Sequence, residues 1–309
     1  MNTAIDFSKT RMLFFVVSLI LIVGGIAGTI IQGGFNLGID FQAGLSMRVQ
    51  IDSNAQNLEI GQVRQALTSL DGSEVQSIGP DGAGQFTVRV RDDGSVPGFE
   101  DVVSSQVLEA LGQAFGSVEV LEQSYVGPRF SEDLTSQAIW LVTLAVGLIL
   151  VYLWFRFRIA YAVSSVIALV HDVIIMIGFF GTFQVELTSA TIAAILTIVG
   201  YSLNDTIVIF DRIRENEKLL SGQKIGVITN ASINQSLSRT VITSLTTLVA
   251  VVAIFIFTTG QIKDFALALM VGILVGTYSS IYIASPFFEM FHKTQVKRGT
   301  APAVPAKTN

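Results

Sequence analysis

Long apolar runs alternate with short polar segments along most of the chain. A helix needs roughly 20 apolar residues to cross about 30 Å of hydrocarbon. Runs of about this length lie at residues 12–31, 138–155, 160–181, 187–210, 241–257 and 265–288. The pattern therefore predicts an α-helical polytopic membrane protein with six transmembrane helices.

The interval between the first two runs has a different pattern. Apolar and polar residues alternate in strand-like fashion at 47–51, 75–78, 86–90 and 118–120, helical spacing appears at 58–70 and 102–114, and a Gly-Pro-Asp-Gly turn lies at 79–82. The resulting order β-α-β-β-α-β is that of a ferredoxin-like fold. We therefore expect an α+β ferredoxin-like external domain between helices 1 and 2.

These patterns divide the chain into four expected parts. Residues 1–32 hold the cytoplasmic N-terminus and transmembrane helix 1, and residues 33–133 form the external domain. Residues 134–292 hold transmembrane helices 2–6. Residues 293–309, rich in Ala, Pro, Lys and Thr, have the composition of a disordered cytoplasmic tail.

Composition agrees with a membrane protein and excludes several kinds of site. Hydrophobic residues make up 50% of the chain, charged residues 14%, and the mean hydropathy is +0.61, values typical of integral membrane proteins. Cysteine is absent and only two histidines occur, so thiolate chemistry is impossible and metal ligands are few. No HExxH, GxSxG or nucleotide-binding loop is present. We therefore predict no catalytic residues, no metal site and no enzyme activity.

The distribution of charge predicts the orientation. With the N-terminus inside, thirteen of the nineteen basic residues fall in cytoplasmic segments, and the short external loops hold only Lys263. The remaining five lie in the long external segment, and long segments translocate largely regardless of charge. We therefore expect both termini in the cytoplasm. The external segment itself carries fifteen acidic residues, which we interpret as a solvated acidic surface.

One acid-base pair interrupts the later apolar runs. Asp205 lies inside the run 187–210, and Arg239 stands at the head of the run 241–257. A charged side chain in a membrane-spanning helix costs about 2.5–3.5 kcal/mol on insertion scales. Moving Arg239 away from Asp205 would favour proton uptake, and returning it would favour release. We interpret Asp205 as a proton carrier and Arg239 as its charge partner, with a static ion pair between two helices as the alternative.

Other polar residues accompany this pair. Tyr201 and Ser202 precede Asp205 by four and three residues and so share its helix face, and with Asn204 we expect them to hold water or hydrogen bonds. His171 and Asp172 lie near the middle of the third run. They either extend an ion path or form a polar contact between helices. A carboxylate with hydroxyl neighbours serves H⁺ or Na⁺, so both coupling ions stay open.

Several motifs occur at fixed places relative to the six runs. They are Gly38-Ile39-Asp40-Phe41 after the first run, Val126-Gly127-Pro128 before the second, Val170-His171-Asp172 in the third and Val199-Gly200-Tyr201-Ser202-Leu203-Asn204-Asp205-Thr206 in the fourth. On these motifs the chain resembles the SecF branch of the SecD/SecF family of bacterial protein-export membrane proteins. The family usually has Gly-Gly where this chain has Ala43-Gly44. For the motif residues Gly38, Asp40, Phe41 and Gly44, a turn or helix cap is favoured over a direct role.

The resemblance has implications for function and partners. It implies a subunit that works with SecD, the SecYEG channel and YajC, and that uses the proton-motive force to draw unfolded preproteins across the bacterial inner (plasma) membrane. It also implies half of a twelve-helix bundle of the resistance-nodulation-division (RND) superfamily, with no cofactor other than the coupling ion and no nucleic acid. Two alternatives are an RND-type small-molecule or lipid transporter subunit and a structural translocon subunit without ion coupling.

Overall fold

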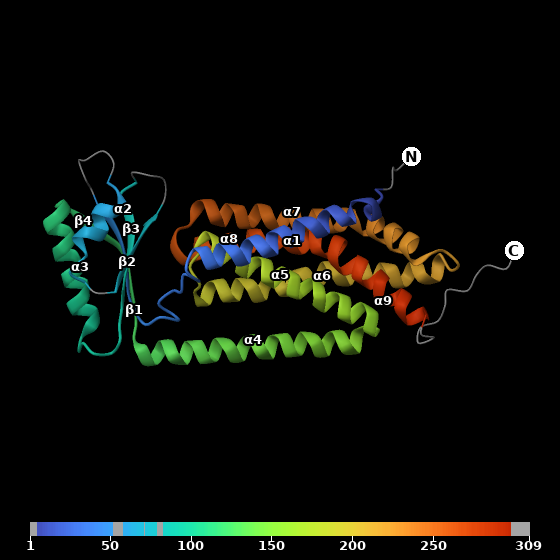
Figure 1. Cartoon of the computed structure of the whole chain (residues 1–309), viewed down its shortest axis with the longest axis horizontal. Helices are drawn as coiled ribbons and strands as arrows, with labels where there is room; N and C mark the ends of the chain where they lie inside the picture. The colour runs from blue at the N-terminus through green and yellow to red at the C-terminus, as the bar shows by residue number, and fades with distance from the viewer. Residues whose placement is uncertain (1–4, 52–57, 71, 79–82, 298–309) are drawn as a thin grey trace. The chain divides into compact units, whose positions relative to one another are not determined.

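The computed structural model describes residues 5–51, 58–70, 72–78 and 83–297 (Figure 1). The chain forms two compact units. One comprises Met1–Asn36 and Leu141–Asn309, and the other comprises Leu37–Trp140. The turn expected at 79–82 and residues 298–309 of the expected tail lie outside the described residues.

The first unit is a bundle of long helices. Its helical segments are α1 (Phe7–Ile31), α4 (Pro128–Arg156, which begins in the second unit), α5 (Ile159–Phe183), α6 (Ser189–Leu219), α7 (Ile225–Phe257), α8 (Gly260–Ser279), the π-helical segment η1 (Ser280–Ala284) and α9 (Ser285–Lys297). In the described part of the chain, six helical stretches are long and apolar enough to cross a membrane. The predicted polytopic fold with six spans is confirmed.

Small residues bring neighbouring helices of the bundle into close contact. A Cβ atom placed on Gly25 of α1 would lie 2.9 Å from the Cα of Gly178 on α5. A Cβ atom on Gly276 of α8 would lie 2.9 Å from the Cβ of Ser202 on α6. Real Cβ atoms do not approach that closely, so both helix pairs depend on glycine at these positions. The second contact lies beside the polar residues described below.

Helix α9 changes the expected extent of the tail. We expected disorder from residue 293, but α9 continues to Lys297. Phe288 and His292 are buried on one face of α9, and Glu289 pairs with Lys293 at 3.8 Å one turn later. Burial of an apolar face and a favourable i, i+4 pair extend the helix beyond the apolar run.

The second unit contains a four-stranded sheet with helices on one face. Its elements are β1 (Gly44–Ile51), α2 (Ile60–Ala66), β2 (Ser73–Ile78), β3 (Gln85–Arg91), α3 (Phe99–Phe115) and β4 (Val118–Val126). The strand order is β2-β3-β1-β4, and each neighbouring pair is antiparallel. Alternate residues of β1, including Met47 and Val49, pack with Val107 and Leu111 of α3 in one core. The predicted β-α-β-β-α-β order is confirmed (Figure 1).

The glycine motif forms the entry to β1. The backbone amides of Phe41 and Gln42 both donate to the carbonyl of Gly38, which closes a tight turn. A Cβ atom on Gly44 would collide with the carbonyl oxygen of Val90 on β3, so this close approach requires glycine. Ala43, in contrast, does not adopt a positive φ. The departure from the family pattern at Ala43 therefore carries no backbone penalty.

Candidate functional site

Buried polar side chains gather where helices α5, α6, α7 and α8 pack against one another. Such groups are costly in apolar surroundings unless they have partners. Those on the four helices that bear on the site are His171, Asp172, Ser202, Asp205, Thr206, Ser236, Thr240, Ser244 and Ser279. They form two carboxylate centres, one at Asp172 and one at Asp205.

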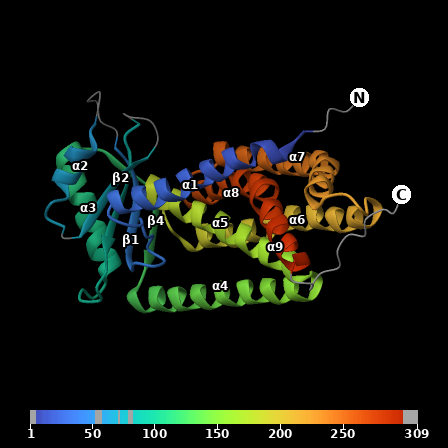
Figure 2. The ribbon, with the colours of Figure 1, turned by 45° about the vertical axis from the view of Figure 1, so that its right-hand side comes forward.

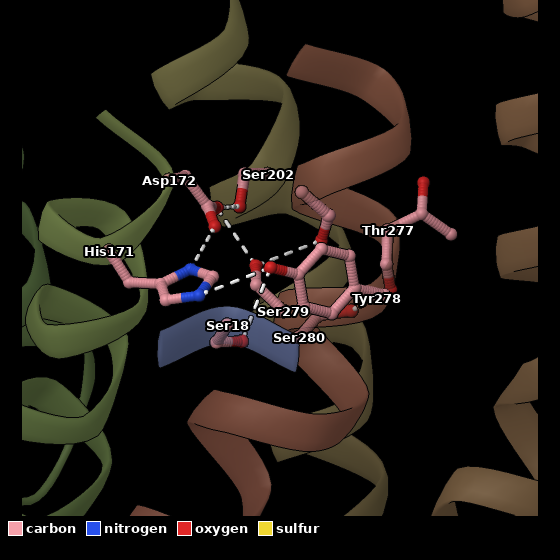
Figure 3. Close-up of polar contacts among 9 residues, drawn as sticks. Ser18, His171, Asp172, Ser202, Thr277, Tyr278, Ser279 and Ser280 are labelled. Carbon is pink, nitrogen blue, oxygen red and sulfur yellow. Dashed lines mark hydrogen bonds and ion pairs between the residues drawn. The ribbon is translucent and has the colours of Figure 1, made fainter. Parts of the chain in front are cut away.

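The Asp172 carboxylate is 1% exposed and fully bonded (Figure 3). Its Oδ2 atom accepts hydrogen bonds from the hydroxyl of Ser202 on α6 at 2.6 Å and the hydroxyl of Ser279 on α8 at 2.8 Å. Its Oδ1 atom lies 2.9 Å from Nδ1 of His171. Hydroxyl and imidazole donors stabilise the ionised form of a buried carboxylate. This centre therefore ties α5, α6 and α8 together through one carboxyl group.

The same network extends to the first helix. The Nε2 atom of His171 lies 3.2 Å from the hydroxyl of Tyr278, and that hydroxyl lies 3.3 Å from the hydroxyl of Ser18 on α1. Figure 3 shows the imidazole of His171 with one contact to the Asp172 carboxylate and another to the Tyr278 hydroxyl. Because Tyr278 precedes the π-helical segment η1 by two residues, the network reaches the one stretch of α8–α9 where the regular α-helical bonds change. Such segments occur often at functional sites.

The Asp205 carboxylate has fewer partners. It is 3% exposed, and among the described residues its Oδ2 atom has no hydrogen-bond partner. The side chains that act on this carboxylate are the guanidinium of Arg239 and the hydroxyl of Ser244, both on α7. A buried charged oxygen without a partner is costly. Asp205 thus carries a buried oxygen that no donor among the described residues satisfies.

Arg239 does not form a direct ion pair with Asp205. Its side chain lies on the exposed face of α7, and within the described residues no ion pair of 4.0 Å or less joins it to Asp205. The two charges attract each other at longer range. A direct ion pair between α6 and α7 is therefore not the arrangement found here.

The two carboxylate centres are connected through hydroxyl groups. Ser244, which acts on Asp205, lies 2.8 Å from the hydroxyl of Thr277 on α8. Thr277 donates to the carbonyl of Ile273 at 2.6 Å, so it accepts from Ser244. A serine hydroxyl has one proton, and Ser244 therefore donates either to Thr277 or to Asp205. The acceptor to which Ser244 donates therefore links the charge of Asp205 to α8, where Tyr278 and Ser279 contact the Asp172 network.

The polar neighbours expected on the helix of Asp205 have different partners. Ser202 shares the helix face of Asp205, and its hydroxyl donates to Asp172 on α5. The hydroxyl of Tyr201 lies 3.5 Å from that of Thr247 on α7. Asn204 is exposed, because adjacent residues of a helix point about 100° apart. His171 and Asp172 are adjacent in space as well as in sequence.

Several residues of the site were missed at the level of sequence. They are Ser18, Ser244, Thr277, Tyr278 and Ser279. Each is a hydroxyl in an apolar run, and such residues commonly bond to their own helix backbone. The sequence does not show which of these hydroxyls faces a carboxylate on another helix.

Two models of known protein families match segments of this chain that include the residues described above. The family model described as protein export membrane protein SecD/SecF, C-terminal, matches residues 106–294, and the SecD/SecF GG motif matches residues 29–55. The first match covers more than half of the chain and includes both carboxylate centres. The second covers the turn at Gly38 and the entry to β1.

Individual relatives agree with the family models. The chain is 41% identical to the protein translocase subunit SecF of Borreliella burgdorferi over 95% of this chain and 99% of that protein. It is 39% identical to the SecF of Rhodothermus marinus over 98% of both. The crystal structure of SecDF from Thermus thermophilus, a translocon-associated membrane protein, superposes with a TM-score of 0.81 and 35% identity over 94% of this chain. This chain spans 39% of that longer SecDF chain.

Proposed function

Since the chain belongs to the SecD/SecF family and is a subunit of the Sec protein-export type, we propose that it couples the proton-motive force to the movement of exported polypeptides. Asp205 carries the proton, and Arg239 sets how strongly the ionised form is held. When Arg239 is near, the carboxylate releases its proton, and when it moves away the carboxylate takes one up. The proton is the proposed coupling ion, and Na⁺ is the alternative that the experiment below tests.

The single observation that carries this proposal is the unpartnered Oδ2 atom of Asp205. A carboxylate that already accepts every available hydrogen bond gains nothing from a proton. One with a buried free oxygen is stabilised when a proton removes its charge. One charge crossing 100 mV is worth about 2.3 kcal/mol, which is enough to shift a two-state equilibrium.

The partners are proposed from the relatives. Proteins named SecDF, such as that of Thermus thermophilus, carry a region similar to this chain in a longer polypeptide, which makes SecD a partner. We further propose that the complex acts on unfolded preproteins at the SecYEG channel, with YajC as an additional subunit. The apolar side chains exposed along α1 and α4 provide surface for lipid and for a second half-bundle.

The chain is a multi-pass membrane protein. We propose the bacterial inner membrane as its location, with both termini in the cytoplasm, from the distribution of its basic residues. The family is one of protein translocase subunits and not of known enzymes. We propose that Asp205 binds and releases a proton without catalysing a covalent reaction.

The test is export into inverted membrane vesicles that contain the chain with SecD and SecYEG. We expect Asp205→Asn to abolish stimulation of export by the proton-motive force while the protein still inserts and assembles. Arg239→Ala should weaken stimulation, because the switch loses its charge. Glu215→Gln is the matched control, since Glu215 lies on α6 but is exposed and paired with Arg212.

If the proton-motive force stimulates export normally in vesicles that contain Asp205→Asn, the proton-carrier proposal fails and a structural subunit without ion coupling is favoured. Stimulation that follows an imposed Na⁺ gradient and ignores a pH gradient would replace the proton by Na⁺. Export that is unaffected when the chain is absent, together with transport of a small molecule or lipid, would favour the RND-type transporter.

A further inference from the structure

A second group of ionisable side chains lies at the far end of α6 and takes no part in the centres described above. Glu217 is two residues from the end of α6, Tyr161 is near the start of α5, and His292 is on α9. All three helix ends lie at the same end of the bundle (Figure 2), the end that the basic residues assign to the cytosol. Helices α5 and α9 pack directly against each other there.

The three side chains face one another. The Nδ1 atom of His292 lies 3.6 Å from Oε1 of Glu217, and the two side chains are 11% and 15% exposed. The Tyr161 hydroxyl interacts electrostatically with Glu217, and the flanking cations are Arg158, which precedes α5, and Arg214 on α6. His292 is influenced by Glu217 and Arg158. The cluster therefore contains one carboxylate, one imidazole, one phenol and two guanidinium groups, contributed by α5, the residue before it, α6 and α9.

Two atoms of this cluster are buried without a hydrogen bond. Within the described residues, the Tyr161 hydroxyl and Oε1 of Glu217 have no hydrogen-bond partner. Leaving buried polar atoms unpaired costs about 1–3 kcal/mol each, so their retention needs an explanation. The Tyr161 hydroxyl can donate and the Glu217 oxygen can accept, and the two groups interact, so this hydroxyl is available to a Glu217 carboxylate that gains or loses a proton. Asp205, twelve residues earlier on α6, also has a buried oxygen without a hydrogen-bond partner among the described residues.

A layer of aromatic rings separates the cluster from the carboxylate centres. The Tyr161 ring stacks on Phe288 with centroids 4.2 Å apart and meets Phe210 edge-on at 5.2 Å. Phe210 and Phe288 are both fully buried. Their rings exclude water and offer no proton acceptor, so this layer closes the route between Asp205 and the cytosolic end. A change in the position of Phe288 would open it.

One continuous segment connects the layer to the Asp172 network. The segment α8–η1–α9 carries Ser279 at its α8 end, where it bonds to Asp172. It then passes through the π-helical residues 280–284 and carries Phe288 in the layer and His292 in the cluster. A shift of register in a π-helical segment rotates everything that follows it. The same movement would therefore displace Phe288 and change the His292–Glu217 distance.

We propose that Glu217, positioned by His292 and Tyr161, is the group that passes the coupling proton to the cytosol, behind a gate formed by Phe210 and Phe288. The Glu217 carboxylate accepts the proton when the gate is open and becomes a neutral acid. It then loses the proton to cytosolic water, which restores the carboxylate beside His292. This inference rests on the proposed function and assigns the cytosolic end of its pathway.

The test uses the same inverted vesicles, in which the cytosolic face is turned outward. We expect Glu217→Gln to reduce stimulation by the proton-motive force at least about tenfold, and formate or azide added outside to restore most of it by carrying the proton. Glu217→Asp should keep most of the stimulation. His292→Gln should shift its dependence on external pH. Glu215→Gln, an exposed carboxylate two residues away, should leave stimulation unchanged.

The outcomes separate the two proposals. If Asp205→Asn abolishes stimulation while inserted Glu217→Gln retains it, the cytosolic assignment to Glu217 is wrong and the proposed function stands. If Asp205→Asn also retains stimulation, the proposed function itself fails. A loss in Glu217→Gln that small acids do not restore assigns Glu217 a structural role and overturns the proposal. If Glu217→Gln does not assemble, an unchanged pH profile in His292→Gln overturns it.

Discussion

Asp172 and Asp205 are both buried carboxylates in adjacent helices of one bundle, yet their surroundings differ. Asp172 has two hydroxyl donors on one oxygen and an imidazole on the other. Asp205 has one oxygen without a hydrogen bond among the described residues and a cation that stays out of direct reach. Both oxygens of Asp172 are thus fixed by hydrogen bonds from three side chains, whereas one oxygen of Asp205 has no such bond.

The difference separates two uses of an acid in a membrane. A fully bonded carboxylate fixes the positions of the helices that donate to it, and its loss is felt as instability. A partly bonded carboxylate contributes little to stability and responds to the movement of a neighbour. Motif position alone does not distinguish them, because each aspartate lies in a family motif. The hydrogen-bond partners of the two carboxylates distinguish them.

The largest effect on stability is expected when each aspartate is replaced by asparagine, which tests the difference between the two centres. Asp172→Asn should lower the unfolding free energy by about 2–4 kcal/mol, because it removes the charge that two hydroxyls and His171 surround. Asp205→Asn should leave it unchanged or raise it, because it removes an incompletely bonded charge. Thermal unfolding of the purified protein in detergent measures both. Equal losses at the two sites would contradict the distinction.

A smaller effect is expected where α8 approaches the Asp172 centre. Gly276→Ala should cost about 1–3 kcal/mol, because the added methyl group would press on Ser202 and displace a donor of Asp172. Gly200→Ala on α6 is the matched control, since a Cβ there meets no atom within 4 Å. The same unfolding measurement applies. A loss in Gly200→Ala as large as that in Gly276→Ala would show that close packing at Ser202 is not the cause.

The smallest effect concerns a saturated carboxylate outside the membrane. Asp92 accepts from the hydroxyl of Tyr125 at 2.7 Å and from the amide of Gly94 at 2.8 Å. The hydrogen bond from Tyr125 to Asp92, together with burial and the nearby charges of Asp92 and Glu100, raises the pKa of Tyr125 to about 12. The neutral phenol therefore adds stability below about pH 10, and this contribution is lost as the pH rises towards 12.

The difference in ultraviolet absorbance between wild type and Tyr125→Phe isolates the titration of this one tyrosine. In an Asp92→Asn background the pKa of Tyr125 should fall from about 12 towards its ordinary value, because the largest cause of the shift is removed. A titration of Tyr125 that does not depend on Asp92 would show that the hydrogen bond is not what shifts it.

Much of the fold could be predicted from sequence because its signals are periodic. The six spans follow from run length, and the order of strands and helices in the second unit follows from alternation at residues such as Met47 and Val49. The ends of the helices were harder to predict from the sequence. Helix α7 begins at Ile225, well before its apolar run, because Ile228 and Ile233 in this mostly polar stretch pack in the core of the bundle.

The site was only partly predictable. Asp205, Arg239 and Asp172 stand out because charge is rare in apolar runs. Their partners do not, because helix periodicity gives the face of a residue and not the helix that packs on that face. Ser202 shares a face with Asp205 but bonds to Asp172. Ser244 and Ser279 acquire their importance only once α7 and α8 are placed beside α6.

The most direct test of the account is infrared difference spectroscopy of the purified complex between acidic and neutral pH, which reports the carbonyl stretch of protonated carboxyl groups. In a Glu217→Gln background, which removes the other carboxylate proposed to exchange a proton, we expect a buried carboxyl band that disappears in Asp205→Asn and persists in Asp172→Asn. A band that persists in Asp205→Asn, or one that disappears in Asp172→Asn with the protein still folded, would contradict the account.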